Sequence, residues 1–331
     1  MKIALLGAAG FIGRIAAQAL SARVEVGELI LVDYNIRDAK RFAKALSPKC
    51  RWAMADAARA QELTRLLTGV NAVANAVGPC AEYEKRILLT CASMGTPAAS
   101  IGDGTLSGDD RREVHDAFRL GGSAAVSGCG MMPGWTELLS AHFLAGGRTA
   151  AGGRQEPAPR RYLFCSLDRF GGYAFFRRTV KDTGRESPAP PGSPAGRYFS
   201  VGEDRLGLPP GRPAGFFRGL EGMTRALGPV GKELSAAFLF WLRRSLGGAE
   251  GAPVAAAGVW TEGENSQAAA VEDIRGRLAG VLLAEAALKL AAGGVKEKGL
   301  LPLSEVVGRE EAERIAGENG GRILAESPPR T

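Results

Sequence analysis

The 331-residue sequence predicts an α/β protein in which a doubly wound parallel sheet is followed by a second domain of α+β type. Two observations support this fold class. In the first quarter of the chain, short apolar runs alternate with segments whose apolar residues recur at helical spacing. In the second half, aromatic and β-branched runs are interrupted by stretches dense in Gly and Pro.

The N-terminal apolar runs have the character of buried parallel strands. Each is only a few residues long, and each ends near a Gly or an acidic residue. Parallel neighbours need a crossover connection, so a helix is expected after each strand. The predicted strands cover residues 2–7, 28–35, 51–57 and 71–78, and the predicted helices cover 11–23, 38–47 and 60–69.

Three glycines mark the first strand-to-helix turn. The segment LLGAAGFIGRIAAQAL, residues 5–20, places Gly7, Gly10 and Gly13 between the first strand and the first helix. Glycines let the backbone approach a pyrophosphate, and the amides at the helix N-terminus supply partial positive charge. Asp33 follows 20 positions after Gly13, at the end of the next strand, where an acid accepts hydrogen bonds from ribose hydroxyls. This context predicts a Rossmann-type dinucleotide site.

The identity of the nicotinamide cofactor depends on the charges near Asp33. This acid would repel a 2′-phosphate, so NAD is the expected cofactor. NADP stays open, because the glycine spacing is wide and Arg37, Lys40 and Arg41 lie close by in the sequence.

Two further segments complete the predicted cofactor site. Asp56, at the end of the third strand, is placed to reach the adenine, and the segment 75–79 passes the nicotinamide side. The predicted cofactor-binding residues are Gly7, Ala9, Gly10, Phe11, Ile12, Gly13, Asp33, Asp56, Val77, Gly78 and Pro79.

The composition argues against several other classes of protein. The longest apolar run, residues 234–242, has about half of the roughly 20 residues needed to span a membrane. Five irregularly spaced cysteines without an export signal predict free thiols in a reducing compartment, so we expect a cytoplasmic protein. His115 and His142 are the only imidazoles, and no metal site is expected. Basic runs with interleaved aromatics, typical of nucleic-acid binding, are not found.

The net charge of +7 is concentrated in the middle of the chain. Residues 151–250 contain 16 Lys and Arg against 9 Asp and Glu, an excess of 16 − 9 = 7 that equals that of the whole chain. Solvated arginines are the favoured explanation of the excess, and attraction of an anionic substrate or membrane surface is the alternative.

Four blocks of sequence, in order along the chain, carry a family resemblance: GAAGFIG, NAVGPCAEYEKRILLTCASMGT, SGCGMMPGWTELLSAHFL and GLLPLSEVV. They resemble the saccharopine dehydrogenase-like oxidoreductases. The resemblance implies a dinucleotide domain over 1–128, a substrate and dimerisation domain over 129–294, and a C-terminal segment, 295–331, that returns to the first domain. The positions that match the family pattern are Gly78, Pro79, Tyr83, Cys91, Gly95, Gly128, Gly130, Pro133 and Gly134.

Two positions depart from the pattern of many relatives. Residues 98–100 are Ala-Ala-Ser where these relatives carry Tyr-Val-Asp, so Ser100 replaces an acid. Met132 stands where they carry an Asp before Pro-Gly. Two hypotheses follow for the function. The first is an NAD(P)-dependent oxidoreductase acting at a C–N centre of an amino-acid-derived or other small carboxylate. The second is a non-catalytic dinucleotide-binding or membrane-associated scaffold that has lost both acids.

An enzyme of this kind transfers a hydride between the nicotinamide and a carbon that bears an amine or imine, with the protein positioning both partners. Tyr83 is the candidate proton donor or acceptor, because it follows the turn beside the expected nicotinamide. A short-chain reductase is disfavoured, since no Tyr has a Lys four residues later. The predicted substrate residues are Ser100, Gly130, Met132, Pro133 and one of the adjacent pair Arg177 and Arg178, which would hold a carboxylate.

The second half of the chain yields coarser predictions. Residues 161–180 predict strands, and 183–214 predict a long Gly- and Pro-rich surface excursion, either a lid or an ordinary loop. Residues 216–246 combine helical apolar patches with basic residues, which suits a core helix, a homodimer contact or a membrane surface. A long helix is expected over 274–292. We expect a homodimer that binds a small-molecule substrate.

Overall fold

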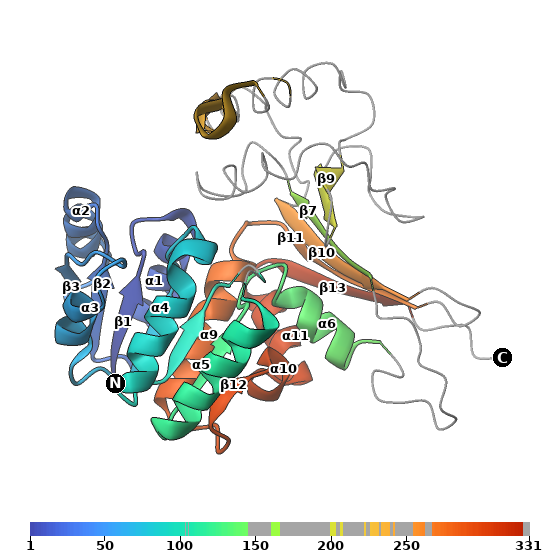
Figure 1. Ribbon diagram of the computed structural model, residues 1–331. Helices are drawn as coiled ribbons and strands as arrows, with labels where there is room; N and C mark the ends of the chain where they lie inside the picture. Colours follow the sequence, from blue (N-terminus) through green and yellow to red (C-terminus); the bar gives the residue numbers. More distant parts are fainter. Residues whose placement is uncertain are drawn as a thin grey trace. The chain divides into compact units, whose positions relative to one another are not determined.

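The chain divides into two compact units. The computed structural model describes residues 1–102, 104, 106–144, 160–165, 199–202, 206–207, 222, 226–231, 233–238, 241, 254–261 and 267–326. Unit 1 comprises Met1–Leu138 and Arg277–Ile315, and unit 2 comprises Leu139–Gly276 and Ala316–Thr331. Each unit is built around its own sheet (Figure 1).

Unit 1 contains a seven-stranded sheet with the order β12-β6-β5-β4-β1-β2-β3. Every neighbouring pair in it is parallel. The order reverses between β1 and β4, as in a doubly wound dinucleotide-binding sheet, and this confirms the predicted fold class. The strands are β1 Lys2–Leu6, β2 Glu28–Val32, β3 Cys50–Ala53, β4 Ala72–Asn75, β5 Ala98–Ser100, β6 Ala124–Ser127 and β12 Gly299–Leu301.

The two faces of this sheet bury alternate residues of the same strands. On β1, Ala4 and Leu6 join a core cluster that contains residues of three covering helices, whereas Ile3 and Leu5 are buried outside it. The cluster helices are α3 Ala60–Leu67, α4 Cys80–Ser93 and α5 Gly108–Leu120, and α1 Phe11–Ala22 packs instead with α9 Leu278–Ala291. The structure also describes the helices α2 Ile36–Leu46, α6 Trp135–His142, α10 Leu303–Val306 and α11 Arg309–Glu318.

Helix α9 lies in unit 1, although the predicted second domain extended to residue 294. The reason is a close helix contact: a Cβ on Gly280 would lie 2.6 Å from the Ile15 side chain, so α9 and α1 approach through a glycine. The buried Glu285 of α9 also pairs with Arg23 and Arg314. A helix buried on so many sides shows little amphipathic pattern, and sequence alone does not reveal its partner.

The C-terminal segment is divided between the two units. Its first part forms β12, which pairs with β6 at the edge of the parallel sheet, and Leu300 lies opposite Ala125. Its last described strand, β13 Gly321–Glu326, pairs with a strand of unit 2.

Unit 2 contains a six-stranded antiparallel sheet with the order β13-β11-β10-β7-β8-β9. Its other strands are β7 Arg160–Cys165, β8 Phe199–Gly202, β9 Leu206–Gly207, β10 Ala255–Trp260 and β11 Ala268–Asp273. The prediction that 183–214 forms only a surface excursion is wrong for β8 and β9, because backbone pairing with β7 recruits these short runs despite the surrounding Gly and Pro. Arg177 and Arg178 lie outside the described residues.

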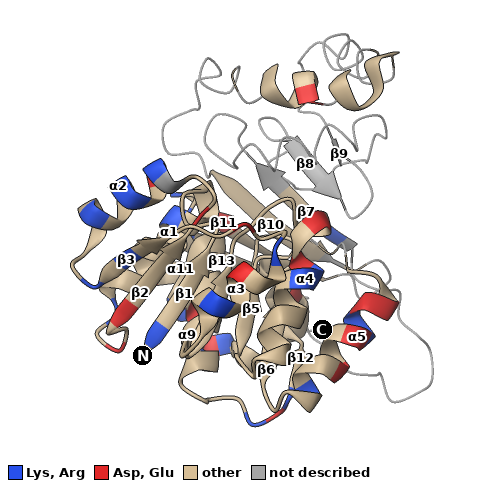
Figure 2. Ribbon diagram, turned by 60° about the vertical axis from the view of Figure 1, so that its left-hand side comes forward, with Lys and Arg blue, Asp and Glu red and all other residues tan. Residues whose placement is uncertain are grey.

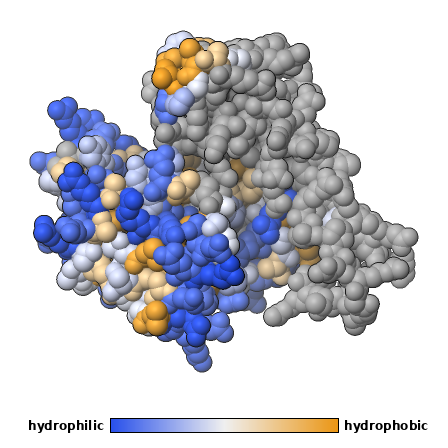
Figure 3. All heavy atoms as spheres, viewed as in Figure 1, coloured by the Kyte–Doolittle hydropathy of each residue, from blue (hydrophilic) through white to orange (hydrophobic). Residues whose placement is uncertain are grey.

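The described residues between 222 and 241 are helical and expose several apolar side chains. Trp241 is 64% exposed and stacks on Phe238 with a centroid distance of 6.2 Å. Figure 3 shows hydrophobic atoms, in orange, at the surface of this helical segment. Within the described part of the chain, no helix combines the length and the apolar character needed to cross a membrane. A contact of this segment with a membrane surface or a second subunit stays a prediction.

The core cluster of unit 1 gives a test of the fold. Phe118→Ala should lower the free energy of unfolding by about 3–5 kcal/mol, because the fully buried ring leaves a cavity. Leu120→Ala, on the same helix but 89% exposed in the wild type, should change it by less than about 0.5 kcal/mol. Urea unfolding followed by circular dichroism measures both. Equal losses would contradict the burial of Phe118.

Candidate functional site

The candidate site lies at the carboxyl edge of the parallel sheet in unit 1. The loop 7–10 follows β1, residues 33–35 follow β2, and residues 76–79 follow β4. Strands β1 and β4 flank the point where the strand order reverses, the usual ligand position in an open α/β sheet.

The glycine loop is packed too closely for side chains. A Cβ on Gly7, which has a φ of +74°, would lie 2.7 Å from the Ala76 carbonyl group, so the loops after β1 and β4 touch. A Cβ on Gly13 would lie 2.1 Å from the Gly7 carbonyl oxygen, which places α1 directly against the turn. Gly10 is the N-cap of α1, and Phe11 and Ile12 form its half-buried first turn. A Cβ at Gly7 or Gly13 would overlap neighbouring backbone atoms, so this turn requires glycine at both positions.

Asp33 is held at this loop by two backbone amides. One carboxylate oxygen accepts a hydrogen bond from the Ala9 amide at 2.9 Å, and the other accepts one from the Asn35 amide at 2.9 Å. A carboxylate has about four lone-pair positions, so acceptor capacity remains for further donors such as ribose hydroxyls. The half-buried side chain is therefore held beside the glycine loop at the end of β2, and its contact with a ribose stays a prediction.

The basic side chains near Asp33 differ in their contacts. Arg14 donates from Nε to the Ala9 carbonyl at 2.8 Å, and its guanidinium lies 5.3 Å from the centre of the Phe42 ring. Lys40 lies over the Trp52 ring of β3 at 5.4 Å. Figure 2 shows that α2 carries a row of basic residues, of which Arg37 and Arg41 are exposed. Arg14 was not among the predicted site residues.

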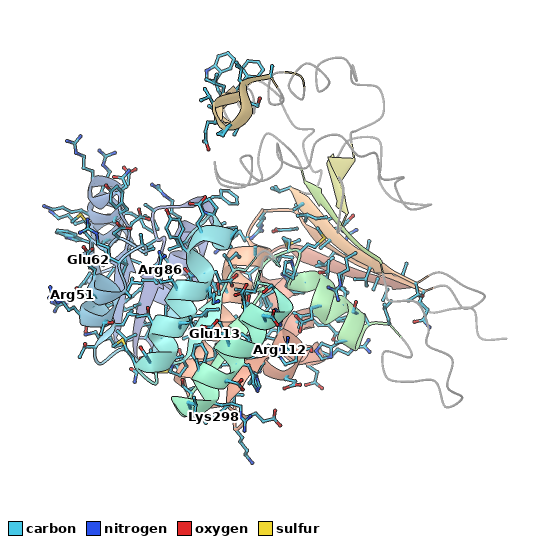
Figure 4. The ribbon with its side chains drawn as sticks, viewed as in Figure 1. Arg51, Glu62, Arg86, Arg112, Glu113 and Lys298 are labelled. Carbon is cyan, nitrogen blue, oxygen red and sulfur yellow. The ribbon has the colours of Figure 1, made fainter. Side chains whose placement is uncertain are left out.

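Asp56 has a local structural role. Its carboxylate accepts a hydrogen bond from the Ala58 amide at 2.8 Å and lies 3.6 Å from Arg59 Nε. Its own amide donates to Glu62 of α3 (Figure 4) at 3.0 Å. These contacts order the turn that leads into α3, and a contact between Asp56 and adenine stays a prediction.

A buried polar pair supports the segment after β4. Asn75 accepts a hydrogen bond from the Val77 amide at 3.1 Å and donates one to the Ser100 hydroxyl at 3.0 Å. Both side chains are fully buried, and the peptide bond between Gly78 and Pro79 is cis. The pair joins the ends of β4 and β5 beneath residues 77–79, so the Ser100 hydroxyl is engaged inside the protein.

Helix α4 brings two functional-site candidates to the same edge. Tyr83 is half-buried and packs against the core cluster. The next residue, Glu84, is fully buried and accepts a hydrogen bond from the Ser127 hydroxyl at 2.7 Å. Glu84 is absent from the residues predicted from the sequence, although it occupies the same helical face as the buried Ile87, Leu88 and Cys91.

The segment 128–134 forms a compact loop after β6. A Cβ on Gly134, which has a φ of +124°, would lie 2.2 Å from the Gly130 carbonyl oxygen, so the loop closes on itself. The Gly130 amide also donates to the Pro133 carbonyl at 3.1 Å. Met132 and Pro133 are half-buried and joined by a cis peptide bond. The structure thus brings Gly130, Met132 and Pro133 together in unit 1.

Cys129, within this loop, is not suited to be a nucleophile. Its pKa is raised well above the ordinary thiol value, first by burial and then by the negative charges of Glu137 and Glu84. The thiolate that would react is therefore scarce at neutral pH. Glu137 instead accepts a hydrogen bond from the Ser304 amide at 3.2 Å, which joins α6 to the start of α10.

The described residues contain no group of three or more His, Cys, Asp or Glu that could hold a metal ion.

Comparison with known proteins identifies the class of the N-terminal region. The family model of the saccharopine dehydrogenase NADP binding domain matches residues 3–121. The resemblance to saccharopine dehydrogenase-like oxidoreductases is thereby confirmed for the region that contains the glycine loop, Asp33 and Tyr83. A search of curated proteins finds no match.

One solved structure resembles the fold of nearly the whole chain. The apo saccharopine dehydrogenase (L-Glu forming) from Saccharomyces cerevisiae is 11% identical, with a TM-score of 0.56 over 98% of this chain and 100% of that chain. Triphenylmethane reductase from a Citrobacter species, complexed with NADP(H), is 16% identical over 38% and 48% of the two chains, with a TM-score of 0.31. A nucleoside-diphosphate-sugar epimerase from Pseudomonas aeruginosa is 27% identical over 31% and 34%, with a TM-score of 0.27. The family match supports an NAD(P)-dependent dehydrogenase or reductase.

The packing of the glycine loop predicts unequal effects of two similar substitutions. Gly13→Ala should weaken NADH binding by at least about tenfold, because its Cβ would displace either α1 or the Gly7 carbonyl. Gly10→Ala should have a smaller effect, since its Cβ would lie 3.2 Å from the same oxygen. Fluorescence titration with NADH measures both. A Gly13→Ala protein that binds like the wild type would contradict the close contact.

Proposed function

We propose that this protein is an NAD(P)-dependent oxidoreductase that transfers a hydride at a C–N centre of an amino-acid-derived or other small carboxylate substrate. The observation that carries the proposal is Asp33, whose carboxylate is hydrogen-bonded to the amide of Ala9 inside the glycine loop. This links the residue suited to a ribose directly to the turn suited to a pyrophosphate.

The residues at the sheet edge fit a dinucleotide. Gly7 and Gly13 carry no side chain, so the turn after β1 packs directly against α1, and the N-terminus of the 12-residue α1 offers backbone amides to a phosphate. Asp33 retains acceptor capacity for the ribose hydroxyls, which favours NAD. Val77, Gly78 and Pro79, supported by Asn75, form the edge of the nicotinamide position. The bound nicotinamide supplies or accepts the hydride at C4.

Tyr83 is the proposed proton donor or acceptor. It lies in the first turns of α4, directly after the segment proposed to pass the nicotinamide, and Glu84 anchors the same helix to Ser127. The loop residues Gly130, Met132 and Pro133 are proposed to meet the substrate, with Ser100 behind them. Arg177 or Arg178 would hold a substrate carboxylate.

The alternative is a non-catalytic scaffold that retains the dinucleotide site. Two residues favour this alternative. Met132 stands where an acid is common in the family, and the buried hydroxyl of Ser100 is hydrogen-bonded to Asn75. Turnover of any amine or 2-oxo acid would exclude this alternative. The protein is further proposed to be cytoplasmic and to form a homodimer.

The role of Asp33 is tested by cofactor binding. Asp33→Ala should weaken NADH binding by about 10- to 100-fold, the effect of losing one charged hydrogen-bond acceptor to the ribose. Asp109→Ala is the control, since that carboxylate is 87% exposed on α5 and pairs there with Arg112. NADH fluorescence measures both. No binding by the wild type would overturn the proposed function.

The role of Tyr83 is tested on whichever amino acid or 2-oxo acid a screen identifies as substrate. Tyr83→Phe should lower kcat by about 100-fold, a typical effect of removing a general acid or base, and leave the dissociation constant of NADH unchanged. A loss of NADH affinity with unchanged kcat would assign the tyrosine to cofactor packing instead.

A further inference from the structure

Two side chains of opposite charge are fixed to the same residue of the glycine loop. The amide of Ala9 donates to the Asp33 carboxylate at 2.9 Å, and the carbonyl of Ala9 accepts from Arg14 Nε at 2.8 Å. The guanidinium of Arg14 also lies 5.3 Å from the centre of the Phe42 ring of α2, within cation–π range. Arg14 is thus positioned by two contacts, although its side chain is exposed.

We propose that Arg14 receives the 2′-phosphate of NADP(H), so that the site binds NADP(H) as well as NAD(H). This inference rests on the proposed dinucleotide function. Asp33 alone would disfavour a 2′-phosphate by charge repulsion, and a guanidinium held beside the same loop residue offsets that repulsion.

The geometry of Arg14 leaves suitable donors for a phosphate. A guanidinium has five N–H groups, and the bond to Ala9 uses only the one on Nε. The four N–H groups on the terminal nitrogens can form paired hydrogen bonds to phosphate oxygens. Contact with the Phe42 ring and the Ala9 carbonyl restricts the side chain before the ligand arrives, which lowers the entropy cost of binding.

The other nearby cations are less well placed. Lys40 lies over the Trp52 ring on β3, 5.4 Å from its centre. Among the described residues, no hydrogen bond or ion pair holds the side chain of Arg37 or Arg41 at the glycine loop. Arg14 is the nearby cation that the structure ties to the loop itself.

The experiment compares NADPH and NADH binding by nicotinamide fluorescence for the wild type and three variants. Arg14→Gln should weaken NADPH binding by about tenfold or more, the usual loss for a charge-assisted phosphate contact, and change NADH binding by less than about twofold. Arg37→Gln should affect NADPH less than Arg14→Gln does. Arg112→Gln, which removes the same charge from an exposed position on α5 (Figure 4), should alter the binding of neither cofactor.

Two further measurements test the 2′-phosphate site without relying on Arg14→Gln. Arg14→Lys keeps the charge and should retain part of the NADPH affinity. With the wild type, adenosine 2′,5′-bisphosphate should compete with NADPH better than 5′-AMP does, and added salt should reduce this advantage.

Four results would overturn the inference. Equal losses of NADH and NADPH in Arg14→Gln would assign the side chain to the shared diphosphate. A selective loss of NADPH in Arg37→Gln, with Arg14→Gln unaffected, would move the phosphate site to α2. Binding of NADH without NADPH by the wild type would remove the 2′-phosphate site and leave the proposed function intact. Binding of neither cofactor would overturn both.

Discussion

The site depends on the close contact between the turn after β1 and the helix that follows it. A Cβ on Gly13 would lie 2.1 Å from the Gly7 oxygen, and one on Gly7 would lie 2.7 Å from Ala76. Because neither residue has a side chain, three elements meet at one point: the end of β1, the start of α1 and the loop after β4. Asp33 and Arg14 both hydrogen-bond to Ala9 of this turn, and residues 77–79 continue the loop that Gly7 touches.

Charge at the proposed adenosine end is arranged around a single residue of that turn. Ala9 binds Asp33 through its amide and Arg14 through its carbonyl. An acid suits a free ribose hydroxyl, and a guanidinium suits a phosphate. The preference between NAD and NADP is therefore proposed to depend on the opposing charges of Asp33 and Arg14. The two backbone amides on Asp33 reduce the freedom of the carboxylate, and Phe42 does the same for the arginine.

Polar side chains are buried at the other end of the site. Asn75 joins Ser100, and Glu84 joins Ser127, so β4, β5, β6 and α4 are linked just below the loops that would meet nicotinamide and substrate. Buried polar groups that are hydrogen-bonded fix geometry, because breaking one bond leaves its partner unsatisfied. The glycine-rich loop 128–134 is tied to the same strand ends, because the amides of Gly128 and Cys129 both donate to the Ser100 carbonyl, at 3.0 and 2.9 Å.

The sequence by itself predicted the parallel fold class with the first four strands, the glycine turn, and an acid, Asp33, at the end of the second strand. These features depend on local rules: short buried strands, helical spacing, and an acid at the end of the second strand. It did not reveal Glu84, Arg14 or the place of α9, whose roles depend on neighbours distant along the chain or across a helix.

Only the tertiary structure decided that α9 packs on α1 through Gly280, that Leu301 ends the last parallel strand, and that β8 and β9 join the antiparallel sheet. It also showed that Asp56 orders the turn before α3. The physical reason is the same in each case. Long-range packing and backbone pairing select among partners that local sequence leaves equivalent, and a single carboxylate or arginine takes its role from the groups that the fold brings within hydrogen-bond distance.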